Sequence, residues 1–257
     1  MGLKLKNKVI LAALSGITDG KFCRKIAEMG AGAVTLGGIS FDKETLEASV
    51  LMVKRGRKEF VIELEKLEEF IKNEVKVIEG LAPVIINARF ATEEGLIRAL
   101  EISNKYADIL EINIHCRQPE IISRGGGQYF AFYPALLLTW LEKHMKQISI
   151  PIIIKFRANV IDEVRLIRLF KEIGIEIFHV DAMHPSLNLP DLKIIEKIRN
   201  QYKDIEIIGG NSVRDIETAN LFLKNGANYI SIGRLALEDL NKLKLIIENF
   251  KVHSLTF

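Results

Sequence analysis

The segment EINIHCRQPEIISRGGGQYF, which begins at Glu111, brings several residue types that could do chemistry close together. Asn113 and Cys116 follow a short apolar run, and a thiol with a reference pKa of about 8.5 can hold a proton near neutral pH and donate it. The same thiol could serve as a nucleophile or a metal ligand, or it could be only a small buried apolar side chain. Gly125–Gly127 indicates a flexible loop that could close over a ligand.

Two glycine turns later in the chain indicate an anion site. They lie in the segments IIGGNSV and ISIGRLA and contain Gly209, Gly210 and Gly233. Glycine lets backbone N–H groups approach an anion closely, and Arg234 can add charge-assisted hydrogen bonds. A phosphate group therefore fits here, whether it belongs to FMN, a sugar phosphate or a phosphorylated intermediate. The alternative is that these glycines only form turns.

Histidine, cysteine and aspartate residues offer a different interpretation, a zinc-dependent hydrolase. His179 and Asp181 would face the same side of an extended strand, because side chains alternate along it. The candidate ligands are His115, Cys116, His179, Asp181 and His184. Their spacing matches no zinc motif, so we predict no metal site, and no definite role follows for the three histidines and Asp181.

These residues are far apart in the chain and need a scaffold that brings them together. Short apolar runs alternate with amphipathic segments eight times along 257 residues, which predicts an α/β fold of the (β/α)8, or TIM barrel, type. The expected strands are Val9–Ala13, Ala33–Leu36, Pro83–Asn87, Asp108–Ile114, Pro151–Lys155, Glu176–Asp181, Ile205–Gly209 and Asn228–Ile232. The expected helices are Asp19–Met29, Lys58–Glu79, Thr92–Asn104, Tyr133–Gln147, Ile161–Ile173, Pro190–Gln201, Val213–Asn225 and Leu237–Asn249. Ser40–Gly56 is an excursion without assigned structure.

The candidate residues fall where a barrel would hold a ligand. They lie at the carboxyl ends of the expected strands, which is where barrel enzymes place their reactive groups. A doubly wound open sheet is the structural alternative. No linker rich in proline, glycine or serine interrupts the pattern, so we expect residues 1–257 to form a single domain.

Composition narrows the class of protein. Apolar residues make up 48% of the chain and charged residues 27%, which excludes a disordered chain or a coiled coil. No apolar run is long enough for a membrane helix, and the apolar stretch near the N-terminus lacks the features of a signal peptide. The net charge of +3 does not by itself indicate nucleic acid. Two cysteines form no disulfide framework and favour a cytoplasmic location.

The order of motifs resembles the FMN-dependent tRNA-dihydrouridine synthases, especially a short archaeal branch. ALSGITDGKFCRKIAEMGAGAV resembles the opening motif of that family, and EINIHC resembles its Asp-Ile-Asn-x-Gly-Cys-Pro motif. PIIIKFR resembles its Lys-x-Arg motif, and IIGGNSV and SIGRLAL resemble its phosphate-binding segments. The resemblance extends from about Val9 to Leu237.

The resemblance implies roles for individual residues. Asn87 aligns with a glutamine that contacts the flavin ring, and Lys155 with a lysine beside that ring. Asn113 aligns with an asparagine near the substrate base, and Cys116 with the cysteine that protonates a uracil ring while reduced flavin delivers a hydride. The remaining cofactor positions are Ala13 in the opening motif and the phosphate-binding residues Gly209, Gly210, Asn211, Gly233 and Arg234.

The chain also departs from the family pattern. Gly-Cys-Pro is replaced by His115-Cys116-Arg117, the first aspartate of that motif by Glu111, and a strand-six histidine by Asp181. Typical members carry a helical tRNA-binding domain after the barrel, and we expect this domain to be absent here. The basic cluster Lys54–Lys58 could contact RNA or could simply begin a solvated helix.

The leading expectation is an FMN oxidoreductase that reduces uridine in tRNA, with NAD(P)H as the electron donor. One alternative is a flavoenzyme like the dihydroorotate dehydrogenases, which acts on a free small molecule. Others are a flavin-free enzyme for a phosphorylated metabolite, the metal-dependent hydrolase, and a protein that only binds its ligand. No membrane partner is expected, and the oligomeric state is left open.

Overall fold

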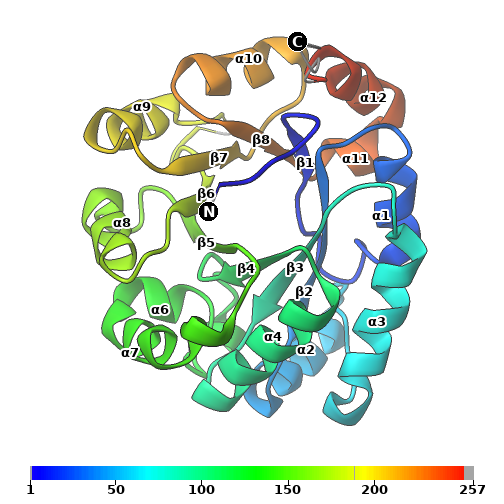
Figure 1. Ribbon diagram of the computed structural model, residues 1–257, viewed down its shortest axis with the longest axis vertical. Coiled ribbons are helices and arrows are strands. Elements are labelled where there is room, and N and C mark those ends of the chain that lie inside the picture. The colour runs from blue at the N-terminus through cyan, green and yellow to red at the C-terminus, as the bar shows by residue number, and fades with distance from the viewer. Residues whose placement is uncertain (1, 188, 252–257) are drawn as a thin grey trace.

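The computed structural model describes residues 2–187 and 189–251, and eight parallel strands form a closed barrel within them. Consecutive strands pair, and β1 closes the ring by pairing with β8 (Figure 1). The strands are β1 Val9–Leu11, β2 Ala33–Ser40, β3 Val84–Arg89, β4 Ile109–Asn113, β5 Ile152–Arg157, β6 Ile177–Asp181, β7 Glu206–Gly210 and β8 Tyr229–Ile232. The prediction of a TIM barrel is confirmed, and the open-sheet alternative is wrong. Residues 1, 188 and 252–257 of the predicted single domain lie outside the described residues.

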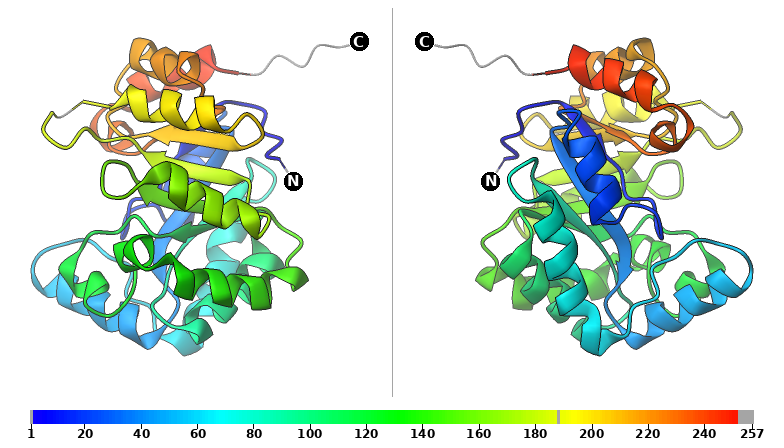
Figure 2. Two further views of the ribbon diagram at one scale, coloured as in Figure 1. Left: turned by 90° about the vertical axis from the view of Figure 1, so that its left-hand side faces the viewer. Right: turned by 90° about the vertical axis from the view of Figure 1, so that its right-hand side faces the viewer.

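Helices surround the strands, and Figure 2 shows them on the outside of the barrel in both side views. The helices are α1 Gly20–Ala27, α2 Lys43–Lys54, α3 Leu67–Ile78, α4 Glu93–Tyr106, α5 Pro119–Ile122, α6 Gln128–Phe132, α7 Pro134–His144, α8 Glu163–Glu172, α9 Leu192–Gln201, α10 Ile216–Lys224, α11 Leu235–Glu238 and α12 Leu240–Asn249. Several begin at an aspartate or threonine whose side chain accepts a backbone N–H of the first turn, as Asp42 does for α2 and Asp239 does for α12. No described helix is long and apolar enough to cross a membrane.

Two segments differ from the sequence-based expectation. The excursion Ser40–Gly56 contains a regular helix, α2, and β2 runs on to Ser40. The helix expected at Lys58–Glu79 begins only at Leu67, after a short 3-10 turn. Glu59 explains the late start, because its buried carboxylate pairs with Arg89 of β3 and holds the chain against the barrel in a non-helical conformation.

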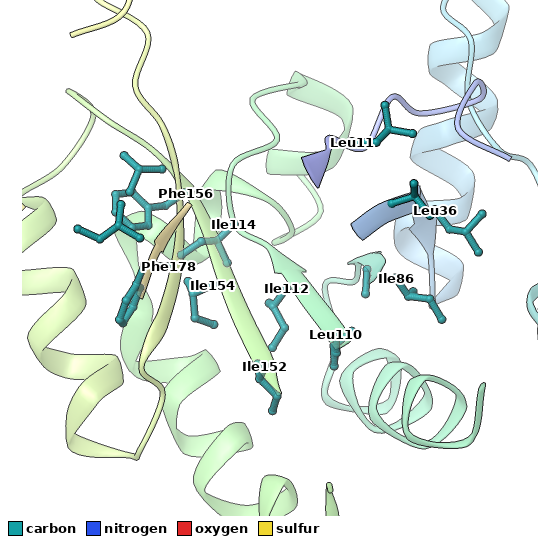
Figure 3. Close-up of a cluster of buried hydrophobic side chains, with 14 of the residues drawn as sticks. Leu11, Leu36, Ile86, Leu110, Ile112, Ile114, Ile152, Ile154, Phe156 and Phe178 are labelled. Carbon is teal, nitrogen blue, oxygen red and sulfur yellow. The ribbon is translucent and has the colours of Figure 1, made fainter. Parts of the chain in front are cut away.

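The outward side chains of the strands form the main core between the barrel and its helices. Figure 3 shows part of this layer, in which Leu110, Ile112 and Ile114 alternate with inward-facing residues along β4 and the chain that follows it. Such near-continuous apolar strands are typical of a parallel sheet that is covered on both faces.

The inward side chains form layers along the barrel axis. The lowest layer is apolar and includes Ile85, Ile109, Ile153 and Ile177, with Leu3 packed against it. The N-terminal segment crosses the centre of the ring (Figure 1), and the Tyr229 hydroxyl donates a hydrogen bond to its backbone. Because side chains alternate along a strand, the residue two positions further on also points inward. In β3 to β6 that residue is polar or charged.

Candidate functional site

A cavity of about 420 Å³ opens at the carboxyl ends of the strands. This volume lies within the usual range for small-molecule and cofactor sites. Its lining comes mainly from β1 and from β5 to β8 with the loops that follow them. The lining residues are Ala12, Ala13, Leu14, Arg57, His115, Arg117, Lys155, Arg157, His179, Asp181, Met183, Gly210, Asn211, Ser212, Val213, Arg214, Ser231, Ile232, Gly233, Arg234 and Leu235.

Beneath the cavity lies a buried hydrogen-bond network centred on the Glu111 carboxylate, which we call the floor. It consists of Asn87, Glu111, Lys155, His179 and Ser231, none of which is more than 6% exposed. Asn87 donates from Nδ2 to Glu111 Oε1 at 2.6 Å, and Lys155 Nζ lies 3.3 Å from the same oxygen. Glu111 Oε2 bonds His179 Nδ1, and His179 Nε2 lies 2.6 Å from Ser231 Oγ. Every member of the floor is therefore held by another member.

The charges of the floor follow from this geometry. Burial favours a raised pKa for Glu111, but the charge of Lys155 and the hydrogen bonds from His179 and Asn87 outweigh it and hold the pKa well below its ordinary value. Burial, helped by the charge of Lys155, lowers the pKa of His179 against the opposing pull of Glu111. Glu111 is therefore an anion that only accepts hydrogen bonds, and His179 is neutral with its proton on Nδ1. It follows that His179 Nε2 accepts the hydroxyl proton of Ser231.

Closer to the mouth of the barrel, a second set of polar residues surrounds Asp181, and we call it the rim. It consists of His115, Arg157, Asp181, Asn211 and Arg234. Asp181 Oδ2 lies 2.7 Å from His115 Nε2 and 3.3 Å from an Arg157 nitrogen, and Asp181 Oδ1 accepts a hydrogen bond from Asn211. Arg234 in turn donates to Asn211 Oδ1 at 3.2 Å. Asp181 thus joins the ends of β5 and β6 to the turns after β4 and β7, and Asn211 extends the rim to the turn after β8.

Asp181 is ionised despite its burial. Burial favours a raised pKa, but the hydrogen bond and charge of His115, the charge of Arg157 and the hydrogen bond from Asn211 together hold the pKa well below its usual range. The turn after β7 that carries Asn211 is bent sharply, with φ of 82° at Asn211 and 58° at Ser212. Left-handed backbone at two consecutive non-glycine residues is uncommon and tends to occur at functional sites.

The cavity is strongly cationic. Six lysine and arginine side chains line it, and Asp181 is the single carboxylate among its described lining residues. Arg157 is paired with Asp181, and Arg214 lies 3.6 Å from Glu238. Arg117 has no ion-pair or hydrogen-bond partner within the part of the chain that the structure describes. A surplus of positive charge in a concave site attracts an anionic ligand.

Most of the predicted cofactor residues line this cavity. Ala13, Lys155, Gly210, Asn211, Gly233 and Arg234 all do so. Gly209 does not, because it faces the helix side, where an added Cβ would meet Phe222 at 2.4 Å. Asn87 lies below the cavity in the floor, with its amide oxygen accepting a hydrogen bond from Asn113 at 2.9 Å.

The two predicted catalytic residues lie differently from the expectation. We expected Asn113 and Cys116 to point into the mouth of the barrel, but neither lines the cavity. Asn113 Oδ1 accepts the backbone N–H groups of His115 and Cys116, so Asn113 shapes the turn. The Cys116 side chain packs against a small apolar cluster of Ala48, Met52 and Ile121. The catalytic roles of both residues stay predictions.

The candidate metal ligands are not gathered into one site. Among the described residues, no group of three or more His, Cys, Asp or Glu side chains could hold a metal ion. His115 pairs with Asp181, His179 is used in the floor, and His184 accepts two backbone N–H groups of its own loop. The geometry therefore does not favour the metal-dependent hydrolase.

Several residues of the site were assigned no role from the sequence. Arg157 and Ser231 could have been found by the alternation of strand side chains, because they lie two positions from Lys155 and Gly233. His179 and Asp181 were noticed as sharing a face, but their partners lie on other strands. Arg214 comes from a loop and was given no role, and Arg57 was expected only as part of the basic cluster Lys54–Lys58; no sequence pattern predicted that either would reach the cavity.

The fold and the cavity together define the class of protein, which is a (β/α)8 barrel with a cationic ligand site at the carboxyl ends of its strands. The family follows from comparison with known proteins. The model of the dihydrouridine synthase family matches residues 10–244, and the chain belongs to this family. Membership supports an oxidoreductase.

Several individual proteins are similar to this chain. An uncharacterized protein of Methanocaldococcus jannaschii is 39% identical over 91% of both chains. The catalytic subunit of dihydroorotate dehydrogenase B (NAD(+)) from the same organism is 23% identical over 90% of this chain and 84% of its own. The tRNA-dihydrouridine synthase B of Pasteurella multocida is 24% identical over 91% of this chain and 67% of its own.

A solved structure shows the same fold. A FabK mutant from Thermotoga maritima superimposes with a TM-score of 0.61 at 9% sequence identity. The match covers 93% of this chain and 65% of the FabK chain. At this identity the likeness concerns the fold alone.

Proposed function

We propose that this protein is a flavin-dependent oxidoreductase that binds FMN in the cavity and reduces a uracil-type ring. The observation that carries the proposal is the cationic cavity at the carboxyl ends of the strands, in a chain that belongs to the dihydrouridine synthase family. Barrel enzymes frequently bind a phosphate group after their seventh and eighth strands, which is where Gly210, Asn211, Gly233 and Arg234 lie.

The residues present fit such a cofactor. Gly210 approaches the interior so closely that an added Cβ would lie 2.3 Å from Ser231 Oγ, so a larger residue would fill the space beside the turn. Arg234 projects from the turn after β8 and supplies a cation for the phosphate. Ala13 and Lys155 line the same cavity and would contact the ring of the cofactor.

When bound, reduced FMN would supply a hydride. The ammonium of Lys155 would stabilise negative charge on the ring, and Glu111 fixes that ammonium from below at 3.3 Å. The resemblance nominates Cys116 as the proton donor. In the structure the Cys116 thiol packs against the apolar cluster of Ala48, Met52 and Ile121. A role for Cys116 as proton donor therefore requires the loop after β4 to move.

Uridine in tRNA is the leading substrate, with NAD(P)H as the electron donor. Relatives named as tRNA-dihydrouridine synthases support this choice. Arg57 of the predicted basic cluster and Arg117 both line the cavity, where they could meet RNA phosphates. Arg55 of the same cluster is paired with Glu120. A cytoplasmic location remains a prediction.

A free small molecule is the second candidate substrate. Relatives named as dihydroorotate dehydrogenases match over most of this chain. A pyrimidine that carries a carboxylate would also suit a cavity with surplus positive charge.

The function can be tested with purified protein, FMN, NADPH and an unmodified tRNA transcript. The expected result is dihydrouridine in the recovered tRNA, measured by mass spectrometry of its nucleosides, and none when FMN is omitted. A parallel reaction with orotate tests the second candidate. A colourless protein that binds no FMN and modifies neither substrate would refute the proposal.

A further inference from the structure

His115 is the histidine of the site that is open to a ligand. Its side chain lines the cavity and is 30% exposed. Nε2 lies 2.7 Å from Asp181 Oδ2, whereas Nδ1 has no hydrogen-bond partner among residues 2–187 and 189–251. His179 differs, because both of its ring nitrogens are used within the floor.

Asp181 orients the ring of His115. The carboxylate is ionised and also held by Arg157 and Asn211, so it accepts the Nε2–H of His115 and fixes the direction of the ring. A carboxylate that orients one nitrogen of a histidine leaves the other nitrogen free to give or take a proton. Here that other nitrogen is Nδ1.

The neighbouring Cys116 is placed differently by the turn. Asn113 Oδ1 accepts the backbone N–H groups of both residues, at 3.1 Å for His115 and 3.0 Å for Cys116. The Cys116 carbonyl accepts the N–H of Gln128 at 2.9 Å, which ties the turn to the glycine loop. The turn thus presents the imidazole to the cavity and the thiol to the apolar cluster.

We propose that His115, held by Asp181, is the proton donor of the proposed reduction. The proposal rests on the proposed function. The imidazolium gives its Nδ1 proton to one carbon of the ring double bond, while a hydride supplied by the reduced cofactor adds to the other carbon. The substrate gains two electrons and two hydrogens, the flavin is oxidised, and His115 becomes neutral with its remaining proton on Nε2. Water reprotonates His115, and NAD(P)H reduces the flavin again.

The test uses flavin-loaded enzyme reduced with dithionite and mixed with an unmodified tRNA transcript. The rate of flavin reoxidation is measured for wild type, His115→Ala and the control His144→Ala, whose imidazole bonds Glu93 away from the cavity. We expect His115→Ala to slow reoxidation by about 100- to 10,000-fold, which is the usual contribution of a general acid. Added imidazole should restore part of the rate, because it can occupy the space left and carry the proton. His144→Ala should match wild type.

A second measurement separates proton transfer from binding. The FMN dissociation constant of His115→Ala, from quenching of flavin fluorescence, should change far less than the reoxidation rate. A wild-type rate in His115→Ala, or a loss that imidazole does not restore, would overturn the proposal. So would abolished turnover in Cys116→Ala beside an active His115→Ala. If the reduced wild-type enzyme is reoxidised by neither tRNA nor orotate, the proposed function itself is refuted, and the role of His115 with it.

Discussion

On β5 and β6 the floor and the rim lie only two residues apart, yet they are built differently. Glu111 of the floor is 1% exposed and bonds three other floor residues, so its interactions are complete without a ligand. His115 and Arg234 of the rim are more open and leave polar atoms facing the cavity. A buried carboxylate that is fully paired contributes to the fold, whereas partly paired cations in a cavity serve a ligand.

The difference shows how one strand can serve both stability and function. Along β6, His179 faces the floor and Asp181 faces the rim, and along β5 the same holds for Lys155 and Arg157. Because side chains alternate, a move of two residues along the strand takes an inward-facing side chain from the floor to the rim. Substitution of Glu111 should therefore change stability most, whereas substitutions in the rim should mainly change ligand binding or turnover.

The largest effect is expected for Glu111→Gln. The amide keeps the shape of the side chain but leaves Lys155 buried without its counter-charge, and breaking a buried ion pair typically costs about 3–5 kcal/mol. We expect a loss of this size in the free energy of unfolding, measured by urea denaturation. Glu120→Gln, which removes the surface pair with Arg55, is the matched control and should change little. Equal effects of the two substitutions would remove the distinction between floor and surface.

Arg234→Ala should weaken ligand binding and leave the stability nearly unchanged, which is the reverse of the effect expected for Glu111→Gln. Loss of a charge-assisted hydrogen bond to phosphate, worth about 1.5–3 kcal/mol, should weaken FMN binding by about 10- to 100-fold. Riboflavin, which has no phosphate, should bind the variant and wild type equally well, and the unfolding midpoint should stay close to wild type. If FMN affinity is unchanged, the phosphate does not lie beside Arg234.

A smaller effect concerns the pH dependence of stability. Burial lowers the pKa of His179 in the folded protein, whereas an unfolded histidine has a pKa of about 6.5. Below that pH the unfolded chain binds a proton that the floor does not, so stability is complete above about pH 6.5 and falls as the pH decreases. One such proton contributes a slope of at most about 1.4 kcal/mol per pH unit. His179→Gln should flatten the profile between pH 7 and 5, and an unchanged slope would contradict a neutral His179.

The smallest effect on stability is expected for Arg117→Ala. Arg117 is exposed and has no partner within the described residues, so the free energy of unfolding should change by less than about 0.5 kcal/mol. Affinity for an unmodified tRNA transcript should fall, and the fall should shrink at high salt because the contact is electrostatic. Measured destabilisation would show that Arg117 has a structural role like that of the floor.

The barrel was predictable because the alternation of an apolar run with an amphipathic segment is repeated along the chain. Eight apolar runs at regular spacing fix the parallel strands, and β4 to β8 lie within a few residues of the expected ranges. The region from Ser40 to Leu67 was not predictable, because Glu59 and Arg89 meet across 30 positions of sequence and replace local helix formation. Local propensity carries no information about such a long-range ion pair.

The site was predictable where it depends on position along a strand. Lys155, Gly210, Gly233 and Arg234 were expected at strand ends and line the cavity. The direction of Cys116 was not predictable, because it depends on the turn that Asn113 shapes. The pairing of His115 with Asp181 joins the loop after β4 to the end of β6, two segments that only the folded barrel brings together.

The central claim is that the cavity at the mouth of the barrel holds FMN, and titration of the purified protein with FMN tests it most directly. Quenching of flavin fluorescence should saturate at one FMN per chain, and the midpoint should shift to higher FMN concentration in Arg234→Ala but not in Glu120→Gln. Absence of saturable binding to the wild-type chain, or binding that Arg234→Ala leaves untouched, would contradict the account.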